Sequence, residues 1–397
     1  MLQHSIPMAR NILPEPPGEL KQHSAALQAR IRAAIAETGS IPFSRYMEMA
    51  LYEPGLGYYS AGLHKLGESG DFVTSPELGP LFAGCMAQQA AEIGAELGNY
   101  QVLEVGAGTG KLAADFLKQV DPDKAPARYR ILERSADLRQ VQQARIERQA
   151  PAWLDRVEWL ERPPAGEWQG LLIANEVLDA LAVERFQVTD GSVQQLCVSD
   201  TGEGFDWAPH DAPPELEAAV RHVESDTGSA LSDGYRSEIQ LHLGDWLKSV
   251  TGSMKRGLAL FVDYGYPRNE YYLPERRDGT LMCHYRHRAH ADPFFWPGLQ
   301  DITAWVDFTA LAEAADACGL DVSGYTTQTM FLVGSGLEEV LQENMAVATN
   351  GGVALADEAR QLTLPGMMGE RFQVMGLARG LAQEPAAFSL NDLRYRL

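Results

Sequence analysis

Apolar and polar residues alternate along this chain with periods that predict strands and helices in turn. Apolar runs typical of buried parallel strands occur at 101–105, 129–133, 157–161, 170–174 and 258–263. Apolar residues recur at helical spacing over 20–38, 44–51, 76–93, 214–224 and 307–318. Further patterns predict a helix over 236–250, a strand over 322–333, a helix over 336–348 and a last strand over 371–378. The order predicts an α/β fold, an open and mostly parallel sheet with helices on both faces.

Two segments interrupt this alternation. Residues 53–75 are rich in glycine, and residues 264–301 are rich in Tyr, Arg, His and Pro without a clear period. Long loops in compact proteins are often functional, so we interpret the first as a lid and the second as a flap over the carboxyl ends of the strands. A hairpin is also predicted, because the apolar runs 183–189 and 193–199 flank Asp190-Gly191.

These features divide the chain into four parts. We expect an N-terminal helical extension with the lid loop at 1–97, and a Rossmann-like core at 98–265 with a hairpin insertion at about 183–235. An inserted cap follows at 266–305, and residues 306–397 complete the core. A chain of 397 residues is long enough for two domains or one elaborated domain.

The turn after the first core strand is rich in glycine. Glu104 lies in the strand, and Gly106, Gly108 and Gly110 follow before a helix that begins at Lys111. Glycine lets the backbone approach a ligand where a Cβ would collide, and a helix N-terminus adds free N–H groups. A dinucleotide fingerprint would need its third glycine at 111. The pattern instead resembles motif I of class I S-adenosylmethionine (SAM) methyltransferases, and a tight turn without a ligand is the alternative.

Acidic residues also end the next two core strands, and ligands of open α/β sheets lie beyond such strand ends. Glu133 can accept hydrogen bonds from both hydroxyls of a ribose, although a solvent-facing strand end would have the same sequence. Glu104 can hold the glycine turn or, through water, the ammonium group of SAM. Glu161 is placed to flank an adenine ring.

Asn175, Glu176 and Asp179 follow the fourth strand, beside the glycine turn, where methyltransferases bind the methyl acceptor. Two carboxylates at this spacing could hold a guanidinium in bidentate fashion and orient its nitrogen toward the methyl group. One of them could accept a proton as the transition state forms. The alternative is a helix N-cap with a first-turn acid, which the same residues would satisfy.

The charge of the chain narrows the class of partner. Lys and Arg number 33 against 54 Asp and Glu, so the formal net charge is −21. The electric field of so negative a chain repels nucleic acids and anionic membranes and favours a cationic partner. The alternative is that the charge serves solubility alone. The four cysteines are far apart, no apolar run approaches a membrane span, and the N-terminus lacks a signal-peptide core. We therefore expect a cytoplasmic, bacterial protein without a disulfide framework.

Three histidines lie close together in the flap. His284, His287 and His290 have a spacing of three residues, in a stretch that does not look helical. A metal site is the alternative to a polar flap, and we expect no metal.

Several blocks of sequence occur in one order along nearly the whole chain. They are Y-E-P-G-L-G-Y-Y at 52–59, G-D-F-V-T-S-P-E at 70–77, the glycine turn, I-L-E-R-S at 131–135, A-N-E-V-L-D-A at 174–180, D-Y-G at 263–265 and M-G-E-R-F at 368–372. Together they resemble the MidA-type SAM-dependent methyltransferases, relatives of a mitochondrial complex I assembly factor that methylates arginine.

The resemblance implies a class I methyltransferase fold, SAM as cofactor and a protein arginine as acceptor. For a bacterial protein, the acceptor would be a subunit of its own quinone reductase. Gly70 and Asp71 of the second block join the expected cofactor site, together with Asn175. A homodimer is compatible with the sequence. Two alternatives stay open: a non-catalytic protein that keeps the SAM fold for assembly or binding, and a methyltransferase for small molecules.

Overall fold

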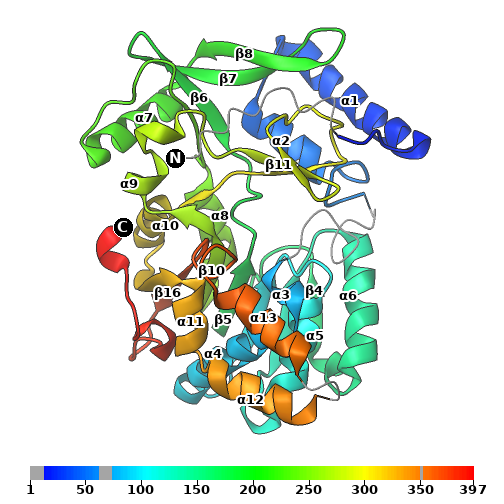
Figure 1. The fold of residues 1–397 in the computed structure, drawn as a ribbon, viewed down its shortest axis with the longest axis vertical. Coiled ribbons are helices and arrows are strands. Elements are labelled where there is room, and N and C mark those ends of the chain that lie inside the picture. Colours follow the sequence, from blue (N-terminus) through cyan, green and yellow to red (C-terminus); the bar gives the residue numbers. More distant parts are fainter. Residues whose placement is uncertain (1–12, 62–73, 349–351) are drawn as a thin grey trace.

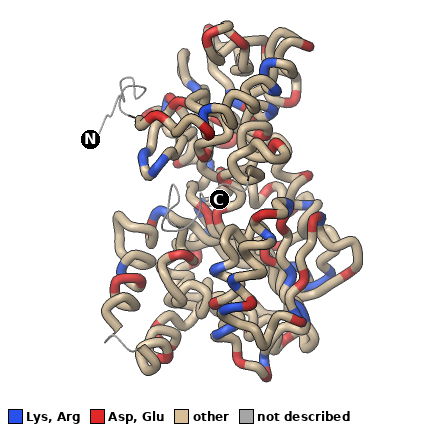
Figure 2. The backbone as a smooth tube through the Cα atoms, turned by 90° about the vertical axis from the view of Figure 1, so that its right-hand side faces the viewer, with Lys and Arg blue, Asp and Glu red and all other residues tan. Residues whose placement is uncertain are grey.

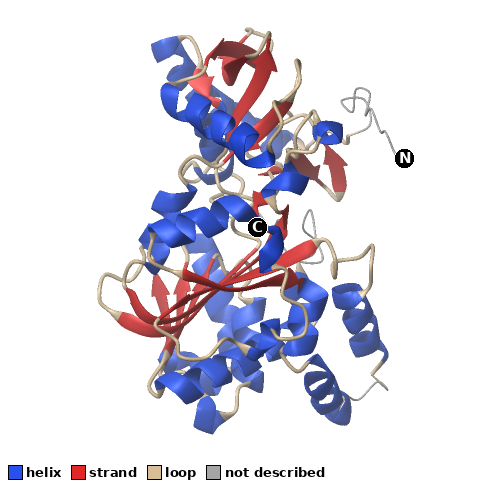
Figure 3. Cartoon of the chain, turned by 90° about the vertical axis from the view of Figure 1, so that its left-hand side faces the viewer, coloured by secondary structure: helices blue, strands red, loops and turns tan. Residues whose placement is uncertain are grey.

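The computed structural model describes residues 13–61, 74–348 and 352–397 and shows two lobes, one above the other (Figure 1). The lower lobe is built around a twisted sheet between layers of helices (Figure 3). The upper lobe combines the N-terminal helices with the two segments inserted into the core. Acidic residues are spread over both lobes (Figure 2). No helix in the described part of the chain is long and apolar enough to cross a bilayer.

The main sheet has the strand order β15-β16-β10-β5-β2-β3-β4. Its strands are β2 (Gln101–Val105), β3 (Arg128–Leu132), β4 (Val157–Leu160), β5 (Trp168–Asn175), β10 (Met254–Tyr266), β15 (Asp321–Thr327) and β16 (Phe372–Arg379), and the short β14 (Val306–Asp307) pairs with β10. The five strands from β4 to β10 run parallel, while β16 runs antiparallel to both of its neighbours. The prediction of an open, mostly parallel sheet is confirmed.

Both faces of this sheet are buried, which explains the nearly continuous apolar runs of its strands. Val102 packs on one face, and Leu103, the next residue, packs on the other. The first face is covered by α4 (Leu81–Leu97), α5 (Lys111–Gln119), α6 (Ala136–Gln149), α11 (Gln328–Gly334), α12 (Leu337–Val347) and α13 (Val353–Thr363). The second face is covered by α8 (Leu243–Thr251) and α10 (Phe308–Ala317).

The upper lobe contains an antiparallel sheet that the N-terminal segment shares with the first insertion. Its strands are β1 (Ile41–Pro42), β6 (Glu184–Thr189), β7 (Ser192–Asp200), β8 (Phe205–Asp211) and β9 (Arg236–Ile239). It is accompanied by α1 (Gly18–Thr38), α2 (Phe43–Tyr52) and α7 (Pro214–Thr227). Ile41 of the N-terminal segment pairs with Val198 of the insertion. The predicted hairpin is confirmed as β6 and β7.

The second insertion joins the same lobe. It forms α9 (Arg268–Tyr271) and a small sheet of β11 (Met282–Tyr285), β12 (Arg288–His290) and β13 (Asp301–Thr303). Cys283 and Ile302 of this sheet pack in one apolar core with Phe43 of α2. The N-terminal segment and both insertions therefore pack together, although the four-part division of the chain stays a prediction.

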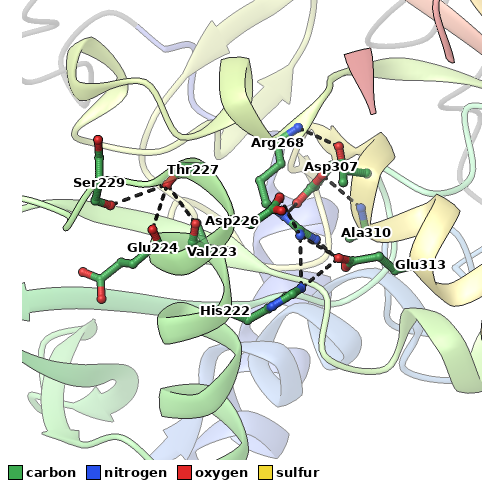
Figure 4. Close-up of polar contacts among 11 residues, drawn as sticks. His222, Val223, Glu224, Asp226, Thr227, Ser229, Arg268, Asp307, Ala310 and Glu313 are labelled. Carbon is green, nitrogen blue, oxygen red and sulfur yellow. Dashed lines mark hydrogen bonds and ion pairs between the residues drawn. The ribbon is translucent and has the colours of Figure 1, made fainter. Parts of the chain in front are cut away.

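Arg268 connects the two lobes (Figure 4). Its side chain is 3% exposed, and its guanidinium lies 3.1 Å from the carboxylate of Asp307 and 2.5 Å from that of Glu313. Glu313 belongs to α10 on the main sheet. The same guanidinium lies 3.2 Å from the carboxylate of Asp226 on α7, in the upper lobe. Arg268 therefore forms ion pairs with carboxylates from both lobes.

Some predicted elements were wrong in part. Residues 236–239 form β9 rather than the start of a helix, because they pair with the edge of β6. The strand predicted to end at 333 ends at Thr327, whose hydroxyl accepts a hydrogen bond from the backbone N–H of Met330 and caps α11. The helix expected from residue 76 to the first core strand is broken at Gly79 into α3 (Ser75–Leu78) and α4. The elements β8 and α13 were not predicted. Turns of 3-10 helix lie at Pro122–Lys124, Pro151–Arg156, Pro274–Arg276, Ala386–Phe388 and Arg394–Arg396.

Candidate functional site

A cavity lies at the carboxyl ends of the main-sheet strands, between the lobes. Its lining includes Glu104, Gly106 and Gly108 from the turn after β2, Glu133 after β3, and Asn175 and Glu176 after β5. From the upper lobe, Tyr52 and Tyr59 close the opposite side. The structure thus brings together most of the residues that the sequence singled out, at the edge where ligands of open α/β sheets bind.

The glycine turn adopts a backbone that other residues rarely take. Gly106, Gly108 and Gly110 have φ angles of +68°, +51° and +76°. The backbone N–H of Gly106 donates to the carbonyl of Leu132, 3.1 Å away, which holds the turn against β3. A Cβ on Gly110 would approach the Cα of Gln142 to 3.0 Å. Gly110 therefore allows α5 and α6 to pack closely, while Gly106 and Gly108 expose their backbone to the cavity.

Glu133 is held in place from two sides. One carboxylate oxygen accepts a hydrogen bond from the backbone N–H of Ser135 at 2.9 Å, and the other accepts one from the Gln142 amide at 3.1 Å. Its burial raises the pKa of this carboxyl above the ordinary value. A carboxylate fixed in this way is suited to a ligand with two adjacent hydroxyls.

Gln142 was missed by the sequence analysis. It is fully buried, and its amide also donates to the carbonyl of Gly108 at 3.0 Å. Its own carbonyl accepts a hydrogen bond from the indole of Trp159 at 3.0 Å. Gln142 therefore ties Glu133 to the glycine turn. The available signal was its place on α6 four residues before the buried Ile146, which puts a polar residue on the core-facing side.

Glu104 lines the same cavity but does not hold the glycine turn by a hydrogen bond of its side chain. Its carboxylate accepts a hydrogen bond from the hydroxyl of Tyr129 at 2.7 Å. Burial, against the opposing effect of this bond, raises the pKa of Glu104 to about 7. Glu104 lines the cavity, where a neighbouring cation would favour the ionised form of its carboxyl.

Not every predicted site residue lines the cavity. Glu161 lies on the surface, where its side chain is 68% exposed and accepts a hydrogen bond from Arg139 at 2.7 Å. Gly70 and Asp71 lie outside the described residues. His284 and His290 lie on β11 and β12, and the described ranges contain no group of three His, Cys, Asp or Glu that could hold a metal ion.

Glu176 has an unusual backbone and an unusual electrostatic setting. Its φ angle is +52°, which is strained for a residue with a side chain. One carboxylate oxygen accepts hydrogen bonds from the Asn175 amide at 3.1 Å and from the backbone N–H of Ser75 at 3.3 Å. The other oxygen has no hydrogen-bond partner in the described part of the chain. Burial, and then the nearby Asp263, raise the pKa of Glu176 to about 8.

The interpretation of these acids as a helix start was wrong. No helix begins after Asn175, and residues 176–182 form turns. The free N–H groups of Val177, Leu178 and Asp179 donate to the carboxylate of Asp263, at 3.2, 2.8 and 3.2 Å. Because Asp263 accepts these bonds, the side chains of Glu176 and Asp179 are not used as caps.

Asp179 is a buried acid without a cation. It is 5% exposed, and its pKa lies well above the ordinary value because of burial and then the charges of Asp263, Asp301 and Glu176. Across residues 13–61, 74–348 and 352–397, no ion pair joins Asp179, Glu176 or Asp263 to a Lys or Arg. A cationic ligand would relieve the mutual repulsion of these carboxylates.

Two tyrosines from the N-terminal segment face these acids. Tyr52 and Tyr59 stack with ring centroids 5.6 Å apart, and the hydroxyl of Tyr52 donates to the carbonyl of Ala180 at 3.0 Å. The sequence block that contains both supported the family resemblance, and Tyr59 falls in the segment 53–75 predicted as a lid, but neither ring had been assigned to the site. Their rings supply an apolar wall opposite the acidic turn.

Comparisons with known proteins agree on the family. Residues 81–326 match the model of a family of S-adenosyl-L-methionine-dependent methyltransferases. A crystal structure of a Burkholderia thailandensis protein bound to S-adenosylhomocysteine is 39% identical, covers 97% of this chain and 100% of that chain, and superposes with a TM-score of 0.88. A second structure from that organism is 40% identical, with the same coverage and TM-score.

Curated relatives extend the match to animals. The mitochondrial protein arginine methyltransferase NDUFAF7 homolog of Drosophila melanogaster is 28% identical over 93% of this chain and 88% of its own length. The NDUFAF7 protein of Danio rerio is 28% identical over 89% and 87%. The chain therefore belongs to this family of SAM-dependent methyltransferases, and SAM is its cofactor.

Proposed function

We propose that this chain transfers the methyl group of SAM to an arginine side chain of a protein. The observation that carries the proposal is the pair of acids after β5, which have no cationic partner in the described part of the chain: Glu176 is half-buried and lines the cavity with the glycine turn, and Asp179 is 5% exposed. A guanidinium is planar and permanently charged, and two carboxylates can bind it through parallel hydrogen bonds. The relatives named protein arginine methyltransferases support this choice of acceptor.

The cofactor would lie along the carboxyl ends of β2 and β3. Its amino-acid part would meet the backbone of Gly106 and Gly108, with Glu104 near its ammonium group, and its ribose hydroxyls would donate to Glu133. The fit rests on the positive φ angles of the turn and on the fixed orientation of Glu133. Bound SAM supplies an electrophilic methyl group on a positively charged sulfur.

The residues of this chain would act mainly by position. Asn175 orients the carboxylate of Glu176, and Asp263 holds the backbone that carries Asp179. Arginine is not deprotonated beforehand, because its pKa exceeds about 12. A proton leaves as the nitrogen–carbon bond forms. The pKa of Glu176 is raised to about 8, and the bound guanidinium would favour the ionised carboxylate, which can then accept this proton. Most of the rate would come from alignment of the nitrogen with the methyl group.

The acceptor protein itself is proposed from the resemblance. A subunit of a bacterial quinone reductase of the complex I type is the candidate that the family resemblance implies. A net charge of −21 is in keeping with a cationic acceptor segment.

The test is methyl transfer from tritiated SAM into a lysate of the source cells, followed by mass spectrometry of the labelled band. We expect one labelled protein that yields methylated arginine. The control is a chain with Glu176→Gln and Asp179→Asn, checked for S-adenosylhomocysteine binding. Label found only in small molecules would show that the acceptor is a small molecule and not a protein. Cofactor binding without any label would favour the non-catalytic alternative.

A further inference from the structure

The glycine turn has a second side-chain support besides Gln142. The hydroxyl of Thr109 donates a hydrogen bond to the carboxylate of Glu77, which lies 32 residues earlier in the chain, on α3. The Glu77 side chain is 15% exposed, and its other carboxylate oxygen lies 3.9 Å from the guanidinium of Arg145 on α6. Both Glu77 and Thr109 line the cavity. A carboxylate from a separate helix therefore holds the middle of the turn.

The same short helix also contacts the other half of the cavity. Ser75 is fully buried at the start of α3, two residues before Glu77, and its backbone N–H donates to the carboxylate of Glu176 at 3.3 Å. One element thus supports both the turn after β2, where the cofactor binds, and the turn after β5, which we assign to the acceptor.

The position of α3 is fixed by the C-terminal part of the chain. The hydroxyl of Ser75 donates to the side-chain carbonyl of Gln328 on α11 at 2.9 Å. Directly after α3, the backbone N–H of Leu81 donates to the carboxylate of Glu358 on α13 at 2.7 Å. A Cβ on Gly79 would lie 2.0 Å from that carboxylate, so Gly79 allows this close approach. These contacts place α3 without any help from a ligand.

The place of Thr109 in the turn gives its hydrogen bond a purpose. Thr109 lies between Gly108 and Gly110, whose φ angles are both positive. Glycine is conformationally permissive, so such a turn needs contacts from outside to keep one shape. Thr109 carries the only side chain among these three residues, and a carboxylate is a stronger acceptor for its hydroxyl than a neutral group. An acid that served only the start of α3 would not need to face this turn.

We propose that Glu77 is a positioning residue for methyl transfer. Through Thr109 it holds the glycine turn in the shape that binds SAM, and through α3 it keeps that turn in register with Glu176. Glu77 acts on the turn and not on the reacting atoms. Its effect on the cofactor holds for any methyl acceptor, whereas the register with Glu176 rests on the proposed function.

The first experiment measures the affinity for S-adenosylhomocysteine by calorimetry. Thr109→Val keeps the shape of the side chain and removes only the hydroxyl, and Glu77→Ala removes the acceptor. Each should weaken binding by about tenfold, and the double variant should bind within about twofold of either, because all three lose the same hydrogen bond. Glu77→Gln keeps an accepting oxygen and should recover most of the loss.

The second experiment measures the rate of methyl transfer from saturating tritiated SAM into protein of a source-cell lysate. Saturation restores occupancy but not alignment, so Thr109→Val and Glu77→Ala should remain about tenfold slower than the wild type. A role in stability alone would leave this rate unchanged once the cofactor is bound. Glu147→Ala, which removes an exposed carboxylate on α6, is the control and should change neither measurement.

Three results would overturn the inference. Wild-type affinity in Thr109→Val, or losses that add up in the double variant, would show that the contact between Glu77 and Thr109 does not support the turn. A wild-type rate at saturating SAM would remove the register with Glu176. If the wild-type chain labels no protein at all, the proposed function fails, and the affinities alone then decide the role of Glu77.

Discussion

The carboxylate of Asp263 accepts a hydrogen bond from the backbone N–H of Asp179 at 3.2 Å, so one buried acid holds the loop that carries another. The same oxygen also accepts the N–H groups of Val177 and Leu178. Asp263 is fully buried at the end of β10. The strand that neighbours β5 therefore sets the shape of the turn that we assign to the acceptor.

Asp263→Ala should destabilise the protein and reduce its activity. Three backbone N–H groups would lose their acceptor in a buried place, which costs on the order of 3 kcal/mol in the free energy of unfolding. Asp263→Asn keeps an accepting oxygen and should cost clearly less. Urea unfolding followed by circular dichroism checks both values, and equal losses in the two variants would contradict this role.

Stability should fall as pH rises through the neutral range. The folded chain holds the proton of Glu176 up to a pKa of about 8, whereas an unfolded chain releases it near the ordinary value of 4.5. Between these values the unfolded state binds fewer protons, so rising pH favours unfolding. Asp263, with a pKa raised to about 7, acts in the same direction.

Glu176→Gln tests this pH dependence, because the amide stays neutral throughout. Its melting temperature should drop less than that of the wild type between about pH 5 and about pH 8, and it should be the more stable chain at the upper end. Glu275→Gln, on an exposed side chain, serves as the matched control. Parallel melting curves for the wild type and Glu176→Gln would show that Glu176 titrates normally.

Cofactor affinity should depend on Glu133 and not on Glu161. Glu133→Ala removes a fixed carboxylate that lines the cavity, and binding of S-adenosylhomocysteine should weaken by about 1.5–3 kcal/mol. Glu161→Ala changes an exposed strand end outside the cavity and should bind as the wild type does. Isothermal calorimetry gives both affinities, and a wild-type value for Glu133→Ala would remove the ribose assignment.

Turnover should depend on both acids of the acceptor turn. Glu176→Gln and Asp179→Asn keep the shape of each side chain and remove its charge. Each should lower kcat by about 100-fold while the affinity for S-adenosylhomocysteine barely changes. Methyl transfer to the labelled acceptor is the measurement. Full activity in the double variant would exclude the proposed binding of the guanidinium by these two acids.

The main sheet could be predicted because its signal is local. Each core strand is a short apolar run, and the glycine turn follows its strand directly, so neighbouring residues carry the information. The short strand at 236–239 was mistaken for helix because its identity depends on pairing with residues 184–187, far away in the sequence. Glu161 was misplaced because a strand end does not reveal whether its last side chain faces the cavity or the solvent.

The supporting contacts of the site could not be predicted for a similar reason. Asp263 meets Asp179 across 84 residues, and Asp301 meets Tyr59 across 242. No periodicity links such positions. Gln142 carries a weak local signal, as a polar residue on a core-facing side of its helix, but its partners come from two different loops.

The pairing of Ile41 with Val198 has a consequence for folding during synthesis on the ribosome. Leu27, Phe43 and Tyr46 of the first two helices are fully buried, and they share a core with Val198 and Ile302. A nascent chain therefore displays this apolar N-terminal surface until more than half of its residues have been translated. The first helices are synthesised long before the residues against which they pack. Their exposed apolar surface therefore favours aggregation and binding by chaperones during synthesis.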